Sequence, residues 1–452
     1  MKIGMLVDTY LPILGGAEVH VLELSRALRQ MGFEVAVCTA VGGTLTPGPS
    51  PNSGRGEKMD TLTSSPYLPS ADASQPLSGG GEMNPDVAGG DAARNIQDNL
   101  PPSPPRRGGQ GGEVDEFPVL RLTGLMGGNW RAVLGIPAAL PRLIAFIRQV
   151  DFVHCHYSFL MAALGCTLAR LLGKPSAVTL HGLGTLDSSV GRSRLYRLYR
   201  YVSLKLANTI IATSQEMRMV ALRFAPAERI VVISNGVNAQ TFSPEPVPAR
   251  PDVHDELVIL SMRRLAPKNG VQYLVEAAPE VIEKMPQARF WVAGEGKLEN
   301  HLRKRVRELG LDTHFNFLGI VPHERTAEMY RQADIVVFPS SAESTSLACL
   351  EAMCVEKAIV ASALSAYKDM LGEAGERGAL VPLFERDESD YNAPLNLPPD
   401  RIHALAEAII ALGYDPERRR ALGKAARRYA ANHYDWKQIA AQTAPIYGGE
   451  AA

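Results

Sequence analysis

Short, almost wholly apolar segments alternate along this chain with segments of helical periodicity, and this alternation limits the possible folds more than any other feature. Apolar runs occur at DFVHCHY, SAVTLHG, NTIIATS and RIVVIS, and the rhythm starts again later with LVILSM. Such strands predict parallel sheets that helices cover on both faces. We therefore expect an α/β protein with two doubly wound domains, which bind ligands where the strands end, in the cleft between them.

A long segment rich in Gly and Pro interrupts the first of these domains. Residues 43–113 contain runs such as TPGPSPNSGRGE and PPSPPRRGGQGGE, with few aromatic or β-branched residues. Such a composition cannot bury enough apolar surface to offset the entropy that ordering would cost. We interpret the segment as a disordered insertion; an arm that docks on a partner is the alternative.

Without the insertion, the chain divides into two domains of similar size. We assign residues 1–42 and 114–240 to the first domain. A Pro-rich passage, SPEPVPARPD, follows it and indicates a linker. The second domain is then expected over residues 241–425.

Charge and cysteine content exclude several classes of protein. The chain has 47 Lys and Arg against 48 Asp and Glu, which argues against general nucleic-acid binding. Its five cysteines form no C-x-x-C pair, which indicates reduced thiols and a cytoplasmic location. The apolar run at the start is too short for a signal peptide, and no segment reaches the roughly 18 apolar residues of a spanning helix.

The balanced total conceals a basic first domain, which has 17 Lys and Arg against 10 Asp and Glu. In the segment GRSRLYRLYRYVSLKLAN, Arg194, Arg197 and Arg200 are interleaved with tyrosines. One interpretation is a helix docked on the domain with its basic face solvated. Its docking stripe would comprise Leu195, Leu198, Val202 and Leu206. The other interpretation is peripheral contact with an anionic membrane.

Glycines and histidines follow the expected strands of the first domain. Gly15 and Gly16 precede a helix, where they would let backbone N–H groups approach a phosphate; a plain tight turn is the alternative. His154 and His156 in VHCHY have no further ligand at metal spacing, so packed imidazoles are favoured over a metal site. His181 precedes a Gly at a strand end, where it would donate a hydrogen bond to a sugar hydroxyl or a phosphate.

Charged residues follow two strands of the second domain. The loop SMRRLAPKNGV puts Arg264 and Lys268 where a diphosphate would sit, although a solvated basic loop would look the same. The segment PSSAESTSLACLEAM carries Glu343 and Glu351, with a helix expected to begin near residues 344–346. Glu351 would lie about two turns inside that helix, so the two carboxylates would contact different parts of one extended ligand.

Together these motifs resemble the retaining glycosyltransferases of family 4, which have the GT-B fold. The resemblance includes GGAEVHVLELSRALRQMGFEV, NGVN, RRLAPKNGV, VAGEGKLENHL, FLGIVPHE and the glutamate pair, in the family's order. It covers the chain except the insertion and implies two Rossmann-like domains that face each other across a cleft. It also implies that residues 426–452 are a closing helix that packs back on the first domain.

The resemblance implies specific roles. The second domain would hold a nucleotide-diphosphate sugar, and the first a glycan, lipid or small-molecule acceptor. Glu343 and Glu351 match the glutamates that bind the donor sugar and the ribose. Arg264 matches the arginine of the diphosphate and His181 the histidine near the transferred sugar, so both, with Glu343, are the expected catalytic residues. The further donor-binding residues are Gly15, Gly16, Lys268, Asn269, Gly294, Gly296, Gly319, Val321, Ser346 and Leu347, and those on the acceptor side are His154, His156 and Asn235.

The chain also departs from the family's pattern. Asn269 stands where the family has a lysine, and Glu356, Ser365 and Ala366 stand where it has glycines. These departures motivate a second hypothesis, a sugar-nucleotide-binding scaffold with little or no turnover. A GT-B phosphorylase or epimerase is a third, although nothing resembles a cofactor-anchoring lysine. We expect no cofactor or metal, because protein cations and helix dipoles would neutralise the diphosphate.

Overall fold

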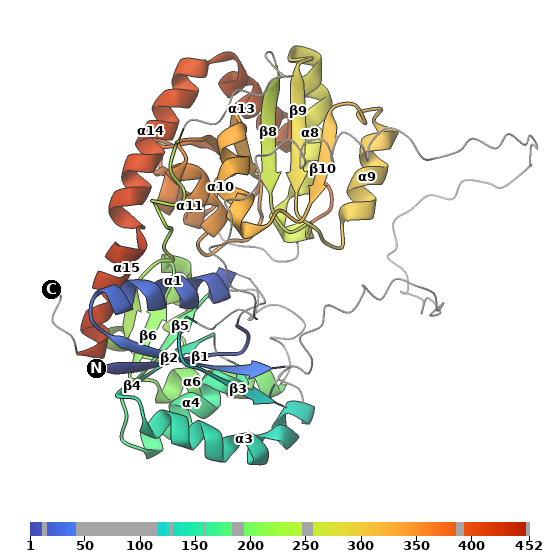
Figure 1. Ribbon diagram of the computed structural model, residues 1–452. Helices are drawn as coiled ribbons and strands as arrows, with labels where there is room; N and C mark the ends of the chain where they lie inside the picture. The colour runs from blue at the N-terminus through green and yellow to red at the C-terminus, as the bar shows by residue number, and fades with distance from the viewer. Residues whose placement is uncertain are drawn as a thin grey trace, which may run out of the picture.

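Two parallel sheets, each covered by helices, form the two domains of this protein (Figure 1). The computed structural model describes residues 1–10, 16–41, 116–123, 125, 130–157, 159–182, 194–245, 256–385 and 393–448. The doubly wound α/β architecture expected from the alternating pattern is confirmed. Residues 43–113 lie outside the described residues, so the disordered insertion stays a prediction.

The first domain is built on a seven-stranded sheet in which every neighbouring pair of strands is parallel. Its central strands are buried along their whole length, as near-continuous apolar sequence requires. From edge to edge the order is β3 (Val119–Thr123), β2 (Glu34–Val41), β1 (Lys2–Val7), β4 (Phe152–His156), β5 (Ser176–Leu180), β6 (Thr209–Ala212) and β7 (Ile230–Val232).

Helices cover both faces of this sheet. One face packs against α3 (Trp130–Arg148), α4 (Leu160–Leu171), α6 (Arg194–Leu206) and α7 (Gln215–Ala221), and the other against α1 (Gly16–Gln30). Figure 1 shows α1 above the sheet and α3, α4 and α6 below it. In the described part of the chain, no helix combines the length and apolar character needed to cross a membrane.

The second domain repeats the plan with six parallel strands. Their order is β10 (Phe315–Gly319), β9 (Ala288–Ala293), β8 (Leu257–Met262), β11 (Ile335–Phe338), β12 (Ala358–Ser362) and β13 (Ala379–Val381). The last strand was not expected from the sequence, because its three residues stand between Gly378 and Pro382, which indicate a turn.

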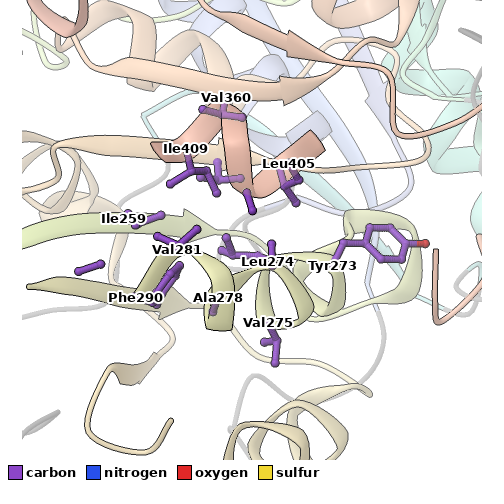
Figure 2. Close-up of a cluster of buried hydrophobic side chains, with 14 of the residues drawn as sticks. Ile259, Tyr273, Leu274, Val275, Ala278, Val281, Phe290, Val360, Leu405 and Ile409 are labelled. Carbon is purple, nitrogen blue, oxygen red and sulfur yellow. The ribbon is translucent and has the colours of Figure 1, made fainter. Parts of the chain in front are cut away.

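Two groups of helices enclose the second sheet. One face packs against α8 (Val271–Lys284), α9 (Glu299–Glu308) and α13 (Pro399–Tyr414). The other packs against α10 (His323–Gln332), α11 (Leu347–Cys354), α12 (Ser365–Leu371) and α14 (Pro416–His433). Figure 2 shows the first of these cores, where Leu274 of α8 and Ile409 of α13 meet Ile259 of the sheet.

The strand order reverses once in each sheet, and the two reversals place the site. β1 lies between β2 and β4, and β8 lies between β9 and β11, so the crossovers on either side run in opposite directions. Loops that diverge in this way leave a crevice at the carboxyl ends of the strands. Farther along the interface, past the ends of β6 and β7, a cavity of about 210 Å³ lies between the domains, and its lining includes Thr213, Ser214 and Ser234 of the first and Ser344, Thr345 and Asp369 of the second.

Hydrogen bonds join the carboxyl ends of the two sheets. Ser344 Oγ, which follows β11, donates to the carbonyl oxygen of His181, which follows β5, at 3.1 Å. Thr345 Oγ1 donates to the carbonyl oxygen of Thr213, which follows β6, at 2.8 Å. The domains therefore face each other through their strand ends, as the GT-B fold implied.

The chain returns to the first domain after α14. That helix packs on α11 and β12, whereas α15 (Trp436–Thr443) packs on α1, beside which it lies in Figure 1. Trp436 lies edge-on to His20 with 5.1 Å between ring centroids. A Cβ atom on Gly236 would lie 2.6 Å from the Trp436 indole, so only glycine fits there. The return expected for residues 426–452 thus starts beyond α14, at Asp435.

We predict that Trp436→Ala destabilises the first domain, although residue 436 follows the second domain in sequence. Trp436 is 5 % exposed, and a truncation of this size in a core costs about 3–5 kcal/mol. Urea unfolding and hydrogen exchange of the β1 and β4 amides measure the loss. Met219→Ala is the control, because Met219 is exposed and its loss should change stability by less than about 0.5 kcal/mol. Unchanged protection of the first domain would contradict the packing described.

Candidate functional site

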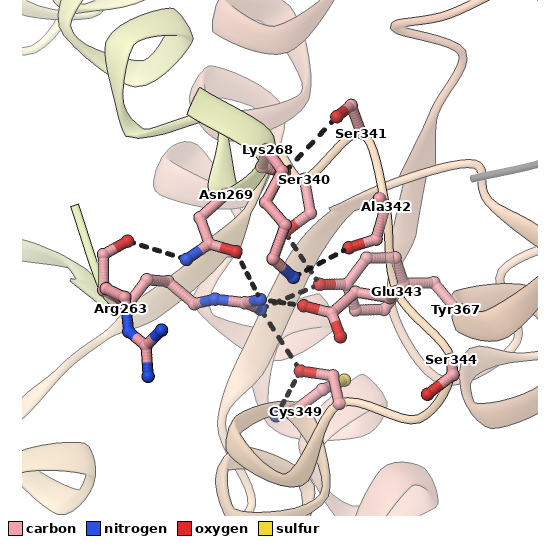
Figure 3. A network of polar contacts seen from close by, with 12 residues as sticks. Arg263, Lys268, Asn269, Ser340, Ser341, Ala342, Glu343, Ser344, Cys349 and Tyr367 are labelled. Carbon is pink, nitrogen blue, oxygen red and sulfur yellow. Dashed lines mark hydrogen bonds and ion pairs between the residues drawn. The ribbon is translucent and has the colours of Figure 1, made fainter. Parts of the chain in front are cut away.

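A buried arginine lies at the centre of the second domain's polar network. Arg263, just after β8, forms an ion pair with Glu343, and their side chains are 8 % and 11 % exposed. Arg263 Nη1 donates to the Tyr367 hydroxyl at 3.0 Å and to Ser346 Oγ at 3.2 Å. Nη2 donates to Asn269 Oδ1 at 3.2 Å (Figure 3). Three residues expected to bind the donor therefore converge on one guanidinium group.

Arg264, which the sequence singled out, does not join this network. Its side chain is exposed, and consecutive residues at the end of a strand project in opposite directions. Burial raises the pKa of Tyr157 in the first domain, and the positive charge of Arg264 opposes that rise. Arg264 therefore extends toward the first domain, and its contact with a diphosphate stays a prediction.

Lys268 and Asn269 lie in a 3₁₀ turn (Pro267–Asn269) that follows the two arginines. Lys268 Nζ donates to the carbonyl oxygen of Ala342 at 3.5 Å, and Asn269 Nδ2 donates to that of Arg264 at 2.7 Å. Burial, followed by the charges of Arg263 and Arg264, lowers the pKa of Lys268 to about 8. The loop after β8 thus concentrates positive charge that an anionic ligand would neutralise.

Two of the expected glycines are required by loop packing. A Cβ atom on Gly294 would lie 2.1 Å from the carbonyl oxygen of Arg263, and one on Gly296 would lie 2.3 Å from that of Leu265. These glycines let the loop after β9 support the loop that carries the arginines. Gly319 accepts a hydrogen bond from the Gly294 N–H at 2.7 Å. Contact of these residues and of Val321 with a nucleotide base stays a prediction.

The helix expected near residues 344–346 is confirmed as α11, which begins at Leu347. Ser346 is its N-cap, and its hydroxyl accepts a hydrogen bond from the Cys349 N–H at 3.3 Å. Leu347 lies against the first residue of α1, since a Cβ atom on Gly16 would be 3.5 Å from its Cδ1. The N-termini of α1 and α11 thus meet between the domains. Gly15 lies outside the described residues.

Glu351 is nearer the start of α11 than expected. It is the fifth residue of the helix, a little over one turn inside it rather than two, because α11 begins at Leu347 and not at residues 344–346. Burial raises the pKa of Glu351 to about 8, and the nearby Tyr330 hydroxyl opposes that rise. A group that donates hydrogen bonds to the carboxylate, such as a ribose diol, would favour its charged form.

Four imidazoles gather at the carboxyl ends of β4 and β5. His20 of α1 was not expected among them, and its Nδ1 lies 2.9 Å from Asn235 Oδ1. His156 Nδ1 lies 3.0 Å from His181 Nε2, and the rings of His20 and His181 are 4.6 Å apart. His181, expected near the transferred sugar, is therefore held by contacts with His156 and His20.

His154 serves the core of the first domain. Its Nδ1 lies 2.7 Å from the Tyr447 hydroxyl and its Nε2 2.7 Å from Thr179 Oγ1, so both ring nitrogens have partners. His154 and His156 are fully buried, and Asn235 is 5 % exposed. Acceptor contact by these three residues stays a prediction, and their positions favour packing.

Three residues of the histidine cluster lie close enough together to bind one metal ion. Single nitrogens of His20, His156 and His181 lie within 4.8 Å of one another. In this structure the facing nitrogens of His156 and His181 contact each other directly, as in the packed imidazoles expected from the sequence. The absence of a metal ion from the reaction stays a prediction.

The sequence arguments also passed over carboxylates on the first domain. Asp8 follows β1 and is partly buried, and burial, with nearby Glu18, raises its pKa to about 7. Glu18 of α1 accepts a hydrogen bond from Thr9. The sequence did contain a signal for Asp8, which is a charged residue directly after a mostly apolar strand. Arg263 gave no separate signal, because the sequence does not say which of two adjacent arginines faces Glu343.

Two facing Rossmann-like domains, with basic and acidic side chains at their strand ends, define a GT-B glycosyltransferase. Residues 248–429 match the model for glycosyl transferases group 1, and residues 15–236 match that for the glycosyl transferase 4-like domain. The chain belongs to the GT4-type glycosyltransferases.

Named relatives and solved structures agree with this family. The chain is 25 % identical over 453 residues to the phosphatidyl-myo-inositol mannosyltransferase of Mycolicibacterium smegmatis, covering 99 % of this chain and 93 % of that one. It is 27 % identical to the D-inositol 3-phosphate glycosyltransferase of Corynebacterium glutamicum, covering 68 % and 74 %. Anabaena HepE in complex with UDP and glucose has the same fold, with a TM-score of 0.67 at 17 % identity over 99 % of each chain.

The imidazole cluster predicts acid sensitivity. Burial lowers the pKa of His20 to about 4 and that of His154 to about 3, from the usual 6.5. Because these pKa values are lower in the folded than in the unfolded protein, the unfolded state takes up protons first as the pH falls. The histidines' contribution to the free energy of unfolding is therefore complete above pH 6.5 and is lost as the pH falls from there to about 4 for His20 and about 3 for His154. His154→Gln should make the loss between these limits shallower in pH-dependent urea unfolding. His403→Gln is the control: Glu280 raises the pKa of exposed His403, so its removal should not flatten the acid limb.

Proposed function

We propose that this chain transfers a sugar from a nucleotide-diphosphate donor to a glycan, lipid or small-molecule acceptor, with retention of anomeric configuration. The observation that carries the proposal is the convergence of a buried ion pair, a basic loop and a helix N-terminus at the cleft. The Anabaena structure solved with UDP and glucose supports a sugar-nucleotide donor. The mannosyltransferase and inositol-phosphate glycosyltransferase names of the relatives support a glycosyl acceptor.

Stabilisation of the leaving group is the main chemical task in this proposal. As the C1–O bond of the donor breaks, negative charge grows on the β-phosphate. Arg264, Lys268 and the N–H groups at the start of α11 would meet that charge without reorganising. These groups make a metal ion unnecessary in the proposed reaction. Glu343 would orient the sugar through its hydroxyls, and no protein nucleophile is assigned.

The first domain would supply the acceptor side of the cleft. Asp8 and Tyr157 follow β1 and β4, opposite the basic loop, and His181 follows β5. A partly buried carboxyl group whose pKa is near neutrality can accept a hydrogen bond from an acceptor hydroxyl or donate one. This side of the cleft would hold the hydroxyl that receives the sugar.

The alternative is a sugar-nucleotide-binding scaffold without turnover. Asn269 in place of the family's lysine motivates it, and so do Glu356, Ser365 and Ala366 in place of glycines. Glu356 has a positive φ of 58°, a conformation that favours glycine, so this departure carries backbone strain. Release of nucleoside diphosphate from a sugar nucleotide separates the hypotheses, because a scaffold binds the donor without releasing product.

A second part of the proposal is contact with an anionic membrane through α6. Arg194, Arg197 and Lys205 are exposed along this helix, and Leu198 and Tyr201 between them are each 54 % exposed. Leu195, Val202 and Leu206 of the expected docking stripe pack partly buried on the core of the first domain, whereas Leu198 of that stripe is exposed. A stripe of cations and large apolar side chains matches the interface of an anionic bilayer.

We predict that Glu343→Gln lowers sugar transfer about 100-fold while nucleoside diphosphate still binds. The substitution keeps the shape of Glu343 but removes the charge that orients the sugar hydroxyls. Thermal-shift screening with UDP-, GDP- and ADP-sugars selects the donor, and NMR of the product gives rate and anomeric configuration. An inverted product would overturn retention.

Glu283→Gln is the matched control, since Glu283 is exposed on α8. This variant should transfer sugar at the rate of the unmodified protein. Equal rates for Glu343→Gln and Glu283→Gln would overturn the role of Glu343. Binding of donors without release of nucleoside diphosphate over hours would favour the scaffold.

For the membrane contact, the double variant Leu198→Gln with Tyr201→Gln should bind phosphatidylglycerol vesicles about tenfold more weakly. The unmodified protein should sediment with these vesicles at low salt, less at high salt, and not with phosphatidylcholine alone. Leu395→Gln is the control, because Leu395 is an exposed leucine of the second domain. Vesicle binding that changes neither with salt nor with the α6 substitutions would contradict the proposal.

A further inference from the structure

Arg263 combines low exposure with an unusual number of contacts. Its two terminal nitrogens each donate to two acceptors, although the side chain retains only 8 % of its surface. The acceptors are Asn269, Glu343, Ser346 and Tyr367. Asn269, Glu343 and Ser346 are also expected to face the donor, so the guanidinium lies where a diphosphate and its sugar would meet.

The network around Arg263 favours an anion. Arg263 and Arg264 both act on Lys268, so three basic side chains of one loop share a small space. Glu343 neutralises the guanidinium in this structure. Taking an ion pair out of water costs free energy, and retention of such a pair at a cleft points to a role beyond stability.

Arg263 also lies beside the position at which the family's lysine is missing. Position 269 is where the resemblance places a lysine, and an amide carries no charge. Arg263 Nη2 lies 3.2 Å from Asn269 Oδ1, so the guanidinium occupies the space next to that side chain. The amide of Asn269 in turn is fixed by its 2.7 Å bond to the carbonyl oxygen of Arg264.

We propose that Arg263 supplies the cation that position 269 lacks, and that it pairs with Glu343 when the site is empty and with the donor's outer phosphate when it is filled. The inference rests on the proposed function and deepens it. A guanidinium binds a phosphate through two parallel N–H bonds, which an ammonium group cannot do. The exchange of partners releases the Glu343 carboxylate to the sugar hydroxyls.

A purely structural role makes a different prediction. If Arg263 only holds the segment 340–346 in place, its loss disturbs the whole nucleotide site, whatever the number of phosphates on the ligand. If Arg263 binds the outer phosphate, its loss weakens the binding of nucleoside diphosphates and leaves the binding of nucleoside monophosphates unchanged. The ratio of the two affinities therefore separates the roles.

Calorimetry with UDP, GDP and ADP and with the matching monophosphates tests the proposal on the full-length protein. Arg263→Met should lower diphosphate affinity about ten- to a hundredfold and change monophosphate affinity less than about twofold. Arg263→Lys keeps the positive charge and should lower diphosphate affinity less than Arg263→Met does. Arg289→Met is the control, because Arg289 pairs with Glu256 at 3.0 Å on β9 and should change neither affinity.

A compensating substitution guards against misfolding, since Arg263→Met leaves Glu343 buried without its partner. The double variant that combines Arg263→Met with Asn269→Lys moves the cation to the neighbouring position. It should regain at least tenfold in diphosphate affinity over Arg263→Met, or bind within about tenfold of the unmodified protein if the single variant does not fold.

The outcomes separate this inference from the proposed function. Two results would overturn this inference and leave the proposed function standing. In the first, Arg263→Met binds a diphosphate as tightly as the unmodified protein does. In the second, Arg263→Met loses affinity for diphosphates and monophosphates alike. Failure of the double variant to regain affinity also overturns the inference. If the unmodified protein binds none of the three diphosphates, the proposed function falls and this inference falls with it.

Discussion

Burial of both faces of two parallel sheets is the constraint on which the rest of the structure depends. Parallel strands need crossover helices, and helices on both sides leave no sheet surface for polar chemistry. The charged side chains of the site therefore lie at the strand ends, where loops diverge at the two points of reversal. The domains place these ends against each other, and Ser344 and Thr345 join them by hydrogen bonds to the backbone of the first domain.

Within the cleft, loop packing and electrostatics depend on each other. Gly294 and Gly296 let the loop after β9 lie against the carbonyl groups of Arg263 and Leu265. That support holds the basic loop close to Glu343, where burial first, and then the charges of Arg263 and Arg264, lower the pKa of Lys268. Across the cleft, burial lowers the pKa values of His20, His156 and His181, which favours neutral imidazoles. The second domain thus offers charge, whereas the first offers uncharged hydrogen-bonding groups near His181.

The sequence predicted the two-sheet fold, the apolar runs that form β4 to β8 and a helix after Glu343, because these depend on local patterns, although that helix begins at Leu347 rather than at residues 344–346. It did not predict contacts that depend on distant residues. His20 and Asn235 are 215 positions apart and meet only through the folded sheet. Arg263 and Arg264 are adjacent, so only their opposite directions from the strand distinguish them. β13 was not predicted because its three residues lie between a glycine and a proline. The family resemblance named the expected roles, but it could not place a guanidinium at position 263.

The return of α15 to the first domain has a consequence for the order in which this chain matures. Trp436, Ile439 and Tyr447 belong to the same core as β1 and β2, and Tyr447 bonds to His154. A chain emerging from the ribosome therefore presents its first sheet long before the residues that complete one face of it. That face of the sheet remains incompletely covered until the second domain has been synthesised, and it is open to chaperone binding during that time. The first domain begins the protein in sequence but is finished last.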